Sequence, residues 1–234
     1  MSPNNQSCRV WSRFEGHRKN GSVLKLRIQE PPSTAQERVL DFVAKYFVTE
    51  ETFQKAAGIY SNPDAIVEYR EILHEVLKSW VVVICCEDTE EVGEILGVSA
   101  IEMVEDKSFG EIPIQTKELQ NLIRIMIECE KLVKPLMKGF AVHHDGRGIT
   151  VHPDYRGLGI ASEFVKIRRL MVNEQNVSMS CAWMTSYGSQ RAAEKDNWET
   201  LFEIAPEELG QKCGVVFKDP PLTFKLMFVR SSKQ

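Results

Sequence analysis

The stretch from Gly148 to Phe164, "GITVHPDYRGLGIASEF", contains the residues of this chain whose types and spacing best suit a chemical role. Gly157 and Gly159 follow Arg156, and they stand between an apolar run and a segment with apolar residues at helical spacing. Backbone N–H groups at the start of a helix point outward, and the helix dipole favours negative charge there. Glycine also lets a ligand approach the main chain closely. The stretch therefore predicts a phosphate-binding loop at a helix N-terminus.

The residues around this loop argue against two familiar nucleotide sites. A dinucleotide fingerprint needs a strand that runs directly into the first glycine, and an acid at the end of the next strand. Here residues 153–155 separate the strand from Gly157, and the next strand ends in Met-Thr-Ser at 184–186 without an acid. The chain also has no G-K-[ST] sequence, which a P-loop requires. A glycine turn that only begins a helix is the alternative that stays open.

A second candidate for chemistry is the pair of carboxylates Glu50 and Glu51, at the end of the first predicted helix. With 100° per residue, the apolar side chains of that helix centre roughly 24° from Val39, Glu50 falls at roughly 20°, and Glu51 at roughly 120°. Glu50 is therefore expected to continue the buried face and Glu51 to lie at its edge. Burial raises the pKa of a carboxyl group toward that of a useful base. A solvated helix end is the alternative, because residues 49–54 could leave the helix.

The elements that must position these groups follow from hydrophobic periodicity and turn residues. The pattern predicts a strand from Leu24, helices over 33–47, 64–78 and 115–137, a strand hairpin within 80–104 with its turn at 87–91, a strand around Ile149, a helix to about 173, a strand within 178–186, a helix over 189–196, and a final strand pair near Val215 and Phe224. The unit from 149 to 185 is the one expected parallel crossover in an otherwise antiparallel sheet. These elements indicate an α+β fold with a mixed sheet. We expect one domain over 23–234, preceded by an N-terminal extension over 1–22.

Composition excludes several classes of function. The 234 residues carry a formal net charge of −4 and no long Lys/Arg run, so nucleic acid is not an expected partner. The first ten residues lack the apolar core of a secretory signal, and no run approaches the length of a membrane span, which predicts a cytoplasmic protein without membrane contact. The six cysteines form no C-x-x-C, and the adjacent His143 and His144 cannot converge on one ion, so no metal is expected.

The segment "VHPDYRGLGIA" resembles the acetyl-coenzyme A motif of the GCN5-related N-acetyltransferase superfamily, and the expected order of elements agrees with that superfamily. Within it, the chain is most similar to the insect-type arylalkylamine N-acetyltransferases. These have an aromatic pair followed by D-E-P-L and a "TSxxS" stretch, which match "YFVTEETF" at 46–53 and "TSYGSQRAAEKDNW" at 185–198. The chain departs from the pattern around Glu50, where Thr49 and Glu51 replace Asp and Pro. It also has Ala193 in place of a frequent tyrosine, Asn197-Trp198 in place of Gly-Phe, and no histidine in "DPPLTF".

The resemblance implies an acetyltransferase fold with helices on both faces of the sheet and two splayed parallel strands that form an acetyl-CoA cleft. It implies that the pantetheine arm pairs with Ile149, Thr150 and Val151. It also implies a pyrophosphate site built by Arg156, Gly157, Leu158, Gly159, Ile160, Ala161 and Ser162. By the same resemblance Glu50 is the general base, and Thr185 and Ser189 orient the amine or protonate the thiolate. Helix capping is the alternative role for either hydroxyl.

The expected function is therefore the acetyl-CoA-dependent acetylation of a primary amine by direct attack on the thioester. The resemblance favours an arylalkylamine acceptor such as dopamine, serotonin, tryptamine or octopamine. A polyamine or agmatine is the first alternative, because Glu51 in place of proline adds an acid suited to a dication. A non-catalytic acyl-CoA-binding member of the fold is the second. The sequence leaves the oligomeric state open.

Overall fold

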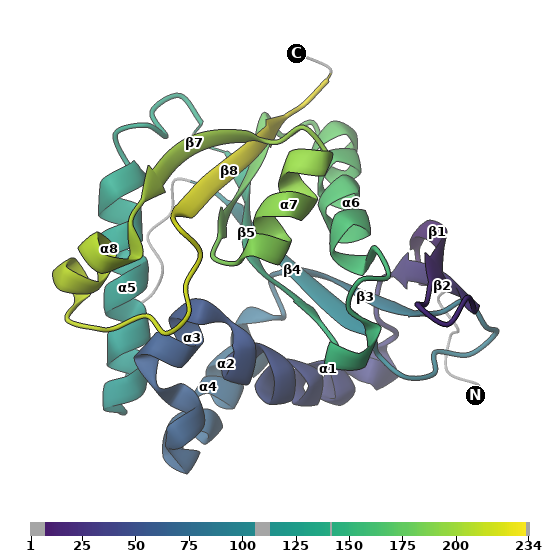
Figure 1. The fold of residues 1–234 in the computed structure, drawn as a ribbon, viewed down its shortest axis with the longest axis horizontal. Helices are drawn as coiled ribbons and strands as arrows, with labels where there is room; N and C mark the ends of the chain where they lie inside the picture. The colour runs from purple at the N-terminus through teal and green to yellow at the C-terminus, as the bar shows by residue number, and fades with distance from the viewer. Residues whose placement is uncertain (1–7, 106–112, 141, 233–234) are drawn as a thin grey trace.

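A computed structural model describes residues 8–105, 113–140 and 142–232, and an eight-stranded sheet runs through its centre (Figure 1). The strands lie in the order β1-β2-β3-β4-β5-β6-β8-β7. Their bounds are β1 (Val10–His17), β2 (Val23–Gln29), β3 (Val81–Glu87), β4 (Gly97–Val104), β5 (His143–Val151), β6 (Met179–Met184), β7 (Glu199–Ile204) and β8 (Phe224–Arg230). Within the described ranges β5 and β6 are the parallel neighbours and the other pairs are antiparallel. The predicted mixed, mostly antiparallel sheet is confirmed.

Helices cover both faces of this sheet, as expected (Figure 1). They are α1 (Gln36–Phe42), α2 (Val48–Glu50), α3 (Thr52–Ala57), α4 (Pro63–Val76), α5 (Lys117–Val133), α6 (Ile160–Glu174), α7 (Tyr187–Lys195) and α8 (Pro206–Cys213), with short turns η1 (Ser33–Ala35), η2 (Val43–Phe47), η3 (Ile59–Ser61) and η4 (Pro153–Tyr155). On one face, Phe164 of α6 packs with Leu26 and Val83 of the sheet. On the other face, Ile125 of α5 and residues of α1–α4 and α8 pack against Ile84.

The expected elements did not include α3, β7 and α8, and two further stretches differ from what was expected. The strand expected near Val215 is wrong: β8 pairs with β7, and Val215 follows α8 in a loop where its N–H bonds to the carbonyl of Gly210. Gly214, with φ of 67°, ends α8. Val215 and Val216 therefore follow a helix cap and do not form a strand. The second stretch is the predicted N-terminal extension. Residues 1–7 lie outside the described ranges, but residues 10–17 form the edge strand β1.

The sheet opens at its centre, between β5 and β6. The parallel pairing covers His144 with Ser180 and Asp145 with Cys181, and it goes no further in the described structure. On its other edge, β5 shifts register against β4: Gly146 lies opposite Ile101, but Gly148 lies opposite Ala100. The residue between the two glycines is therefore the extra residue of a β-bulge. Bulges bend a strand and are frequent beside active sites.

Candidate active site

The edge of β5 that faces β6 is free beyond the point where the two strands separate. Ile149, Thr150 and Val151 pair with Ser99, Val98 and Gly97 of β4 on one edge. No strand in the described part of the chain pairs with their other edge. The three residues predicted to meet the pantetheine arm thus lie on an edge to which an extended chain can add as a further strand. The Val151 carbonyl accepts the Nε–H of Arg156 at 3.4 Å.

The glycine loop connects this free edge to the start of α6. Gly157 and Gly159 have φ of 83° and 86°, and an added Cβ at either would meet nothing within 4 Å. Glycine is therefore suited to these positions by backbone conformation rather than by crowding. Gly159 is the N-cap of α6 and offers no side chain to the first N–H groups of the helix. The N–H groups of residues 160–162 have no partner one turn back, so they suit an anion.

A hollow of about 310 Å³ lies beside this helix start. Its lining comes from the beginning of α6, from α7 and from β1, and consists of Phe14, Glu15, Leu158, Gly159, Ser162, Glu163, Lys166, Ala192, Lys195 and Asp196. Lys166 and Lys195 lie next to the loop, and neither was expected from the sequence. Lys166 pairs with Glu163 at 3.0 Å, and Glu15 and Asp196 also line the hollow. Lys166 could have been predicted from the sequence, because it lies one turn after Ser162 on the same helix face.

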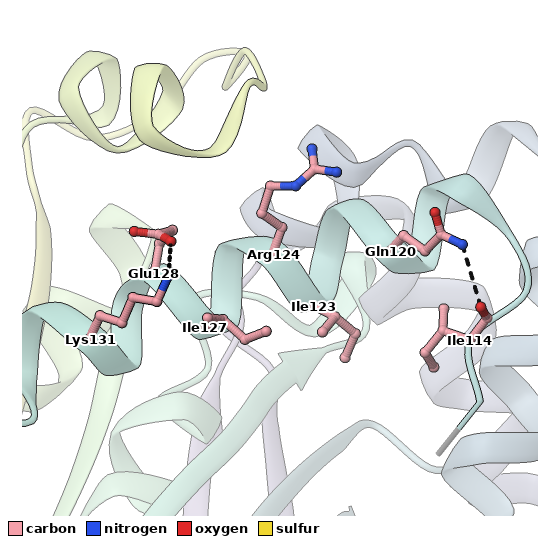
Figure 2. A pocket seen from close by; sticks show the side chains of 7 residues that line it. All are labelled: Ile114, Gln120, Ile123, Arg124, Ile127, Glu128 and Lys131. Atoms are coloured by element: carbon pink, nitrogen blue, oxygen red, sulfur yellow. Dashed lines mark hydrogen bonds and ion pairs between the residues drawn. The ribbon is translucent and has the colours of Figure 1, made fainter. Parts of the chain in front are cut away.

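A second hollow, of about 370 Å³, lies on the outer face of α5 (Figure 2). Figure 2 shows Ile123 and Ile127 along this face, with Arg124 and the ion pair of Lys131 with Glu128 beside them. None of the predicted site residues lines this hollow. We assign it no role in the chemistry.

The structure corrects the expected orientation of Glu50. In the π-helical turn η2 the N–H of Val48 bonds to the carbonyl of Val43, five residues back. Such a turn adds one residue to the helix and shifts the following side chains by about 100°. The expectation that Glu50 continues the buried face is therefore wrong. Its side chain is 49% exposed, and its Oε2 lies 3.6 Å from Nη2 of Arg156 in the glycine loop.

The neighbouring carboxylate, Glu51, takes the inward position. Its backbone is extended, with φ of −71° and ψ of 137°, so the helix breaks here and α3 begins. One carboxylate oxygen accepts the N–H groups of Phe53 and Gln54, both at 2.9 Å, and thereby caps α3. The other accepts the hydroxyl of Thr185 at 2.7 Å, just beyond the end of β6. A second bond, from the Thr52 hydroxyl to the carbonyl of Thr185, also joins α3 to this strand.

This environment perturbs the acidity of Glu51. Burial raises the pKa of its carboxyl group, while the Thr185 hydroxyl and the backbone N–H groups at the start of α3 oppose that rise. The charge of Glu51, together with burial, also raises the pKa of the Tyr69 hydroxyl. A partly buried carboxylate with a raised pKa and a hydroxyl partner is suited to accept a proton from a substrate.

Thr185 and Ser189, which the resemblance groups together, have different partners. Ser186 is the N-cap of α7, and its hydroxyl accepts the N–H of Ser189 at 3.2 Å. In return the Ser189 hydroxyl accepts the N–H of Ser186 at 3.3 Å, which completes a capping box. The capping alternative for Ser189 is confirmed. Thr185 is 9% exposed, and its hydroxyl is directed to Glu51 instead.

His152 holds the first helix against the glycine loop. Its ring lies 4.7 Å from that of Tyr46, which belongs to η2, and 5.4 Å from that of Tyr155, which belongs to η4. Its Nδ1 accepts the N–H of Asp154. The ion pair between Glu50 and Arg156 connects the same two segments. The two carboxylates therefore lie close in sequence but face different structures, the loop for Glu50 and the end of β6 for Glu51.

Over the described ranges, no three His, Cys, Asp or Glu side chains gather closely enough to hold a metal ion. None of the helices in those ranges combines the length and the apolar character that crossing a membrane requires.

The mixed sheet, the single splayed parallel pair and the glycine loop at the start of α6 define the GCN5-related N-acetyltransferase fold. No protein-family model matches the chain, and no curated protein sequence matches it. Among solved structures, a putative arylalkylamine N-acetyltransferase 7 from the yellow fever mosquito is similar over 98% of both chains, with 21% identity and a TM-score of 0.83. A Drosophila melanogaster polyamine N-acetyltransferase that forms N-acetylagmatine is similar over 88% of this chain and 99% of its own, with 11% identity and a TM-score of 0.66. A putative acetyltransferase from Salmonella typhimurium, solved with its cofactor acetyl-CoA, is similar over 89% of this chain and 95% of its own, with 12% identity and a TM-score of 0.53.

Proposed function

We propose that the chain transfers an acetyl group from acetyl-CoA to a primary amine. The observation that carries this proposal is the continuous path from the free edge of β5 to the uncapped N-terminus of α6. The amide groups of pantetheine match an unpaired strand edge, and the pyrophosphate matches a helix start that lacks a side-chain cap. The Salmonella neighbour that binds acetyl-CoA supports the same cofactor.

The proposed reaction is a direct transfer. The amine nitrogen attacks the thioester carbonyl carbon, the carbon–sulfur bond breaks, and its electron pair leaves with the sulfur of CoA. One proton leaves the amine for a base, and the thiolate gains a proton from solvent or from a nearby hydroxyl. A base is needed because an amine with a pKa near 10 is neutral in only about one molecule in a thousand at pH 7, a deficit of roughly 4 kcal/mol.

We propose Glu51 as the base in this chain, although the resemblance implies Glu50. The bond from Thr185, the inward position and the raised pKa support Glu51. Glu50 is half-exposed and pairs with Arg156, a residue that we propose to bind the cofactor's phosphates. Since the π-helical turn inserts one residue ahead of both carboxylates, the side chain that reaches the expected place is one position later in the sequence.

We propose an arylalkylamine as the acceptor. A dication would use two carboxylates facing one space, but Glu50 and Glu51 face the glycine loop and Thr185 respectively. Glu51 is therefore suited to a single ammonium group. The similarity over 98% of both chains to the putative arylalkylamine N-acetyltransferase 7 supports the same choice of acceptor.

The experiment that tests the proposed function has two parts. At 100 times its Kd, acetyl-CoA should stabilise the folded chain by about 2.7 kcal/mol and raise the melting temperature, whereas NADH should have no effect. A panel of arylalkylamines, polyamines and agmatine, assayed for released CoA thiol, then identifies the acceptor. Stabilisation by NADH but not by acetyl-CoA would overturn the cofactor assignment. Binding of acetyl-CoA without turnover of any amine would identify the chain as a non-catalytic member of the fold.

A further inference from the structure

Arg168 is a fully buried cation at the place where β5 and β6 separate. It lies on α6 among the apolar residues that pack against the sheet, and only 1% of its surface is exposed. The described residues place no carboxylate within ion-pair distance, although Asp145 is near enough to favour its charge. Burial lowers the pKa of Arg168 to about 10, so the guanidinium is still protonated at neutral pH. An arginine without a close carboxylate is costly to bury.

Its contacts place the guanidinium against the open end of the sheet. Nη2 donates to the hydroxyl of Ser99 at 3.1 Å, to the carbonyl of Gly148 at 3.1 Å and to that of Ala100 at 3.4 Å. These three acceptors lie on β4 and β5 around the bulge. The described structure gives the Nε atom, which is also buried, no acceptor.

Two glycines of β5 make room for this arrangement. A Cβ at Gly146 would collide with the Arg168 guanidinium and would lie 2.7 Å from Cβ of Ala182 on β6. A Cβ at Gly148 would lie 2.8 Å from the ring of Phe47, on the first helix. Gly146 and Ala182 come directly after the last parallel pair, Asp145 with Cys181. The guanidinium therefore lies over the face of β5 at Gly146, beside the point where the described β5–β6 pairing ends.

We infer that Arg168 is a positioning residue that fixes the bulge of β5 against β4, and thereby keeps β5 turned away from β6 and holds the acetyl-CoA cleft open before the cofactor binds. By bonding the carbonyl of Gly148, it occupies an acceptor on β5 just before the free edge at 149–151. Without it, β5 can continue its pairing with β6 and close the path that we propose for pantetheine. The inference rests on the proposed cofactor.

The test compares Arg168→Met with Arg168→Lys and with a control, Arg124→Met, on the outer face of α5 (Figure 2). If the open form falls to about one tenth of the population in Arg168→Met, the Kd for acetyl-CoA rises about tenfold. Hydrogen exchange should then be slower at the amides of 149–151 and 183–185, because new pairing protects them. Arg168→Lys, which keeps a donor, should restore most of the affinity. Arg124→Met should leave both measurements unchanged.

Ser99→Ala provides a second route should Arg168→Met fail to fold, since it removes an acceptor of the guanidinium on β4 without removing the charge. It should also weaken acetyl-CoA binding and slow exchange along the β5 edge. Unchanged affinity in a folded Arg168→Met chain, or weaker affinity together with faster exchange, would overturn the inference. If the wild-type chain does not bind acetyl-CoA, the proposed function fails. Exchange at the β5 edge still decides the role of Arg168 in that case.

Discussion

The two carboxylates at the end of the first helix give the sharpest test of the chemistry. We expect Glu51→Gln to lower kcat by roughly 10²–10⁴, the usual contribution of a general base, which corresponds to about 3–5 kcal/mol of barrier. Glutamine keeps an oxygen that can accept the N–H groups of Phe53 and Gln54, so the α3 cap survives the change. The loss should therefore appear in kcat with little change in the Kd for acetyl-CoA.

Glu51→Ala separates the chemical role from the structural one. Loss of an N-cap costs about 1 kcal/mol of stability, so this variant should melt at a lower temperature than Glu51→Gln while showing a similar kcat. If kcat instead follows stability across the two variants, Glu51 supports the fold rather than the reaction.

Glu50→Gln is the matched comparison, because it changes the neighbouring residue in the same way. The pair with Arg156 is about half-exposed on both sides and contributes about 0–1 kcal/mol. Its removal should leave kcat nearly unchanged and raise acetyl-CoA affinity by at most about fivefold, since Arg156 is released for phosphate. The assay is steady-state release of CoA thiol over a range of pH, with isothermal titration for acetyl-CoA. A folded Glu50→Gln chain that loses 10² or more in kcat, beside a nearly normal Glu51→Gln, would refute the argument from the π-helical turn.

Four further outcomes follow from the same site. The acidic limb of the pH–rate profile should lie above the ordinary glutamate pKa of 4.5 and should vanish in Glu51→Gln, since burial raises the pKa of that carboxyl. Because the folded state then binds more protons than the unfolded state, the contribution of Glu51 to stability falls as pH rises from 4.5 through the raised pKa. Chemical denaturation of Glu51→Gln should lack this decline. Gly159→Val should abolish measurable acetyl-CoA binding by calorimetry in a folded chain, because a β-branched residue resists φ of 86° and covers the helix start. Replacing both Lys166 and Lys195 with Ala should weaken acetyl-CoA binding by calorimetry more at low than at high salt, whereas equal weakening at both would argue against a phosphate contact.

The sequence predicted most of the sheet and the glycine loop because both depend on local patterns. Strand β3 is a run of apolar, β-branched residues, which favour a strand. The loop has two residues at positive φ, and glycine in the sequence indicates such positions. The free edge at 149–151 is also where the resemblance placed it. The final strand pair failed because Val215 and Val216 resemble a strand, while the Gly214 cap before them depends on α8 packing into the core.

A helical wheel could not predict the orientation of the Glu50 and Glu51 side chains. A wheel assumes 100° per residue throughout, and the π-helical turn at Val43–Phe47 breaks that assumption by one residue. The resemblance carries the same assumption, since it aligns Glu50 with the family's glutamate by counting from the aromatic pair 46–47. The contact that decides the matter, from Thr185 to Glu51, joins residues 134 positions apart and leaves no trace in local periodicity.

The burial of Arg168 is a second feature that the sequence pattern alone does not predict. Its place one residue after Ile167 and one turn after Phe164 put it on the buried stripe of α6, yet an arginine in such a pattern is ordinarily assigned to solvent. Only the sheet explains it, because Gly146 on β5 leaves the space that the guanidinium fills. The glycine and the arginine depend on each other: a side chain at 146 would exclude the guanidinium, and without the guanidinium the space over Gly146 would be left empty. Because a Cβ at 146 would also lie 2.7 Å from that of Ala182 on β6, Gly146→Ala should remain destabilising in an Arg168→Met background, and the two effects on stability should fall short of additive.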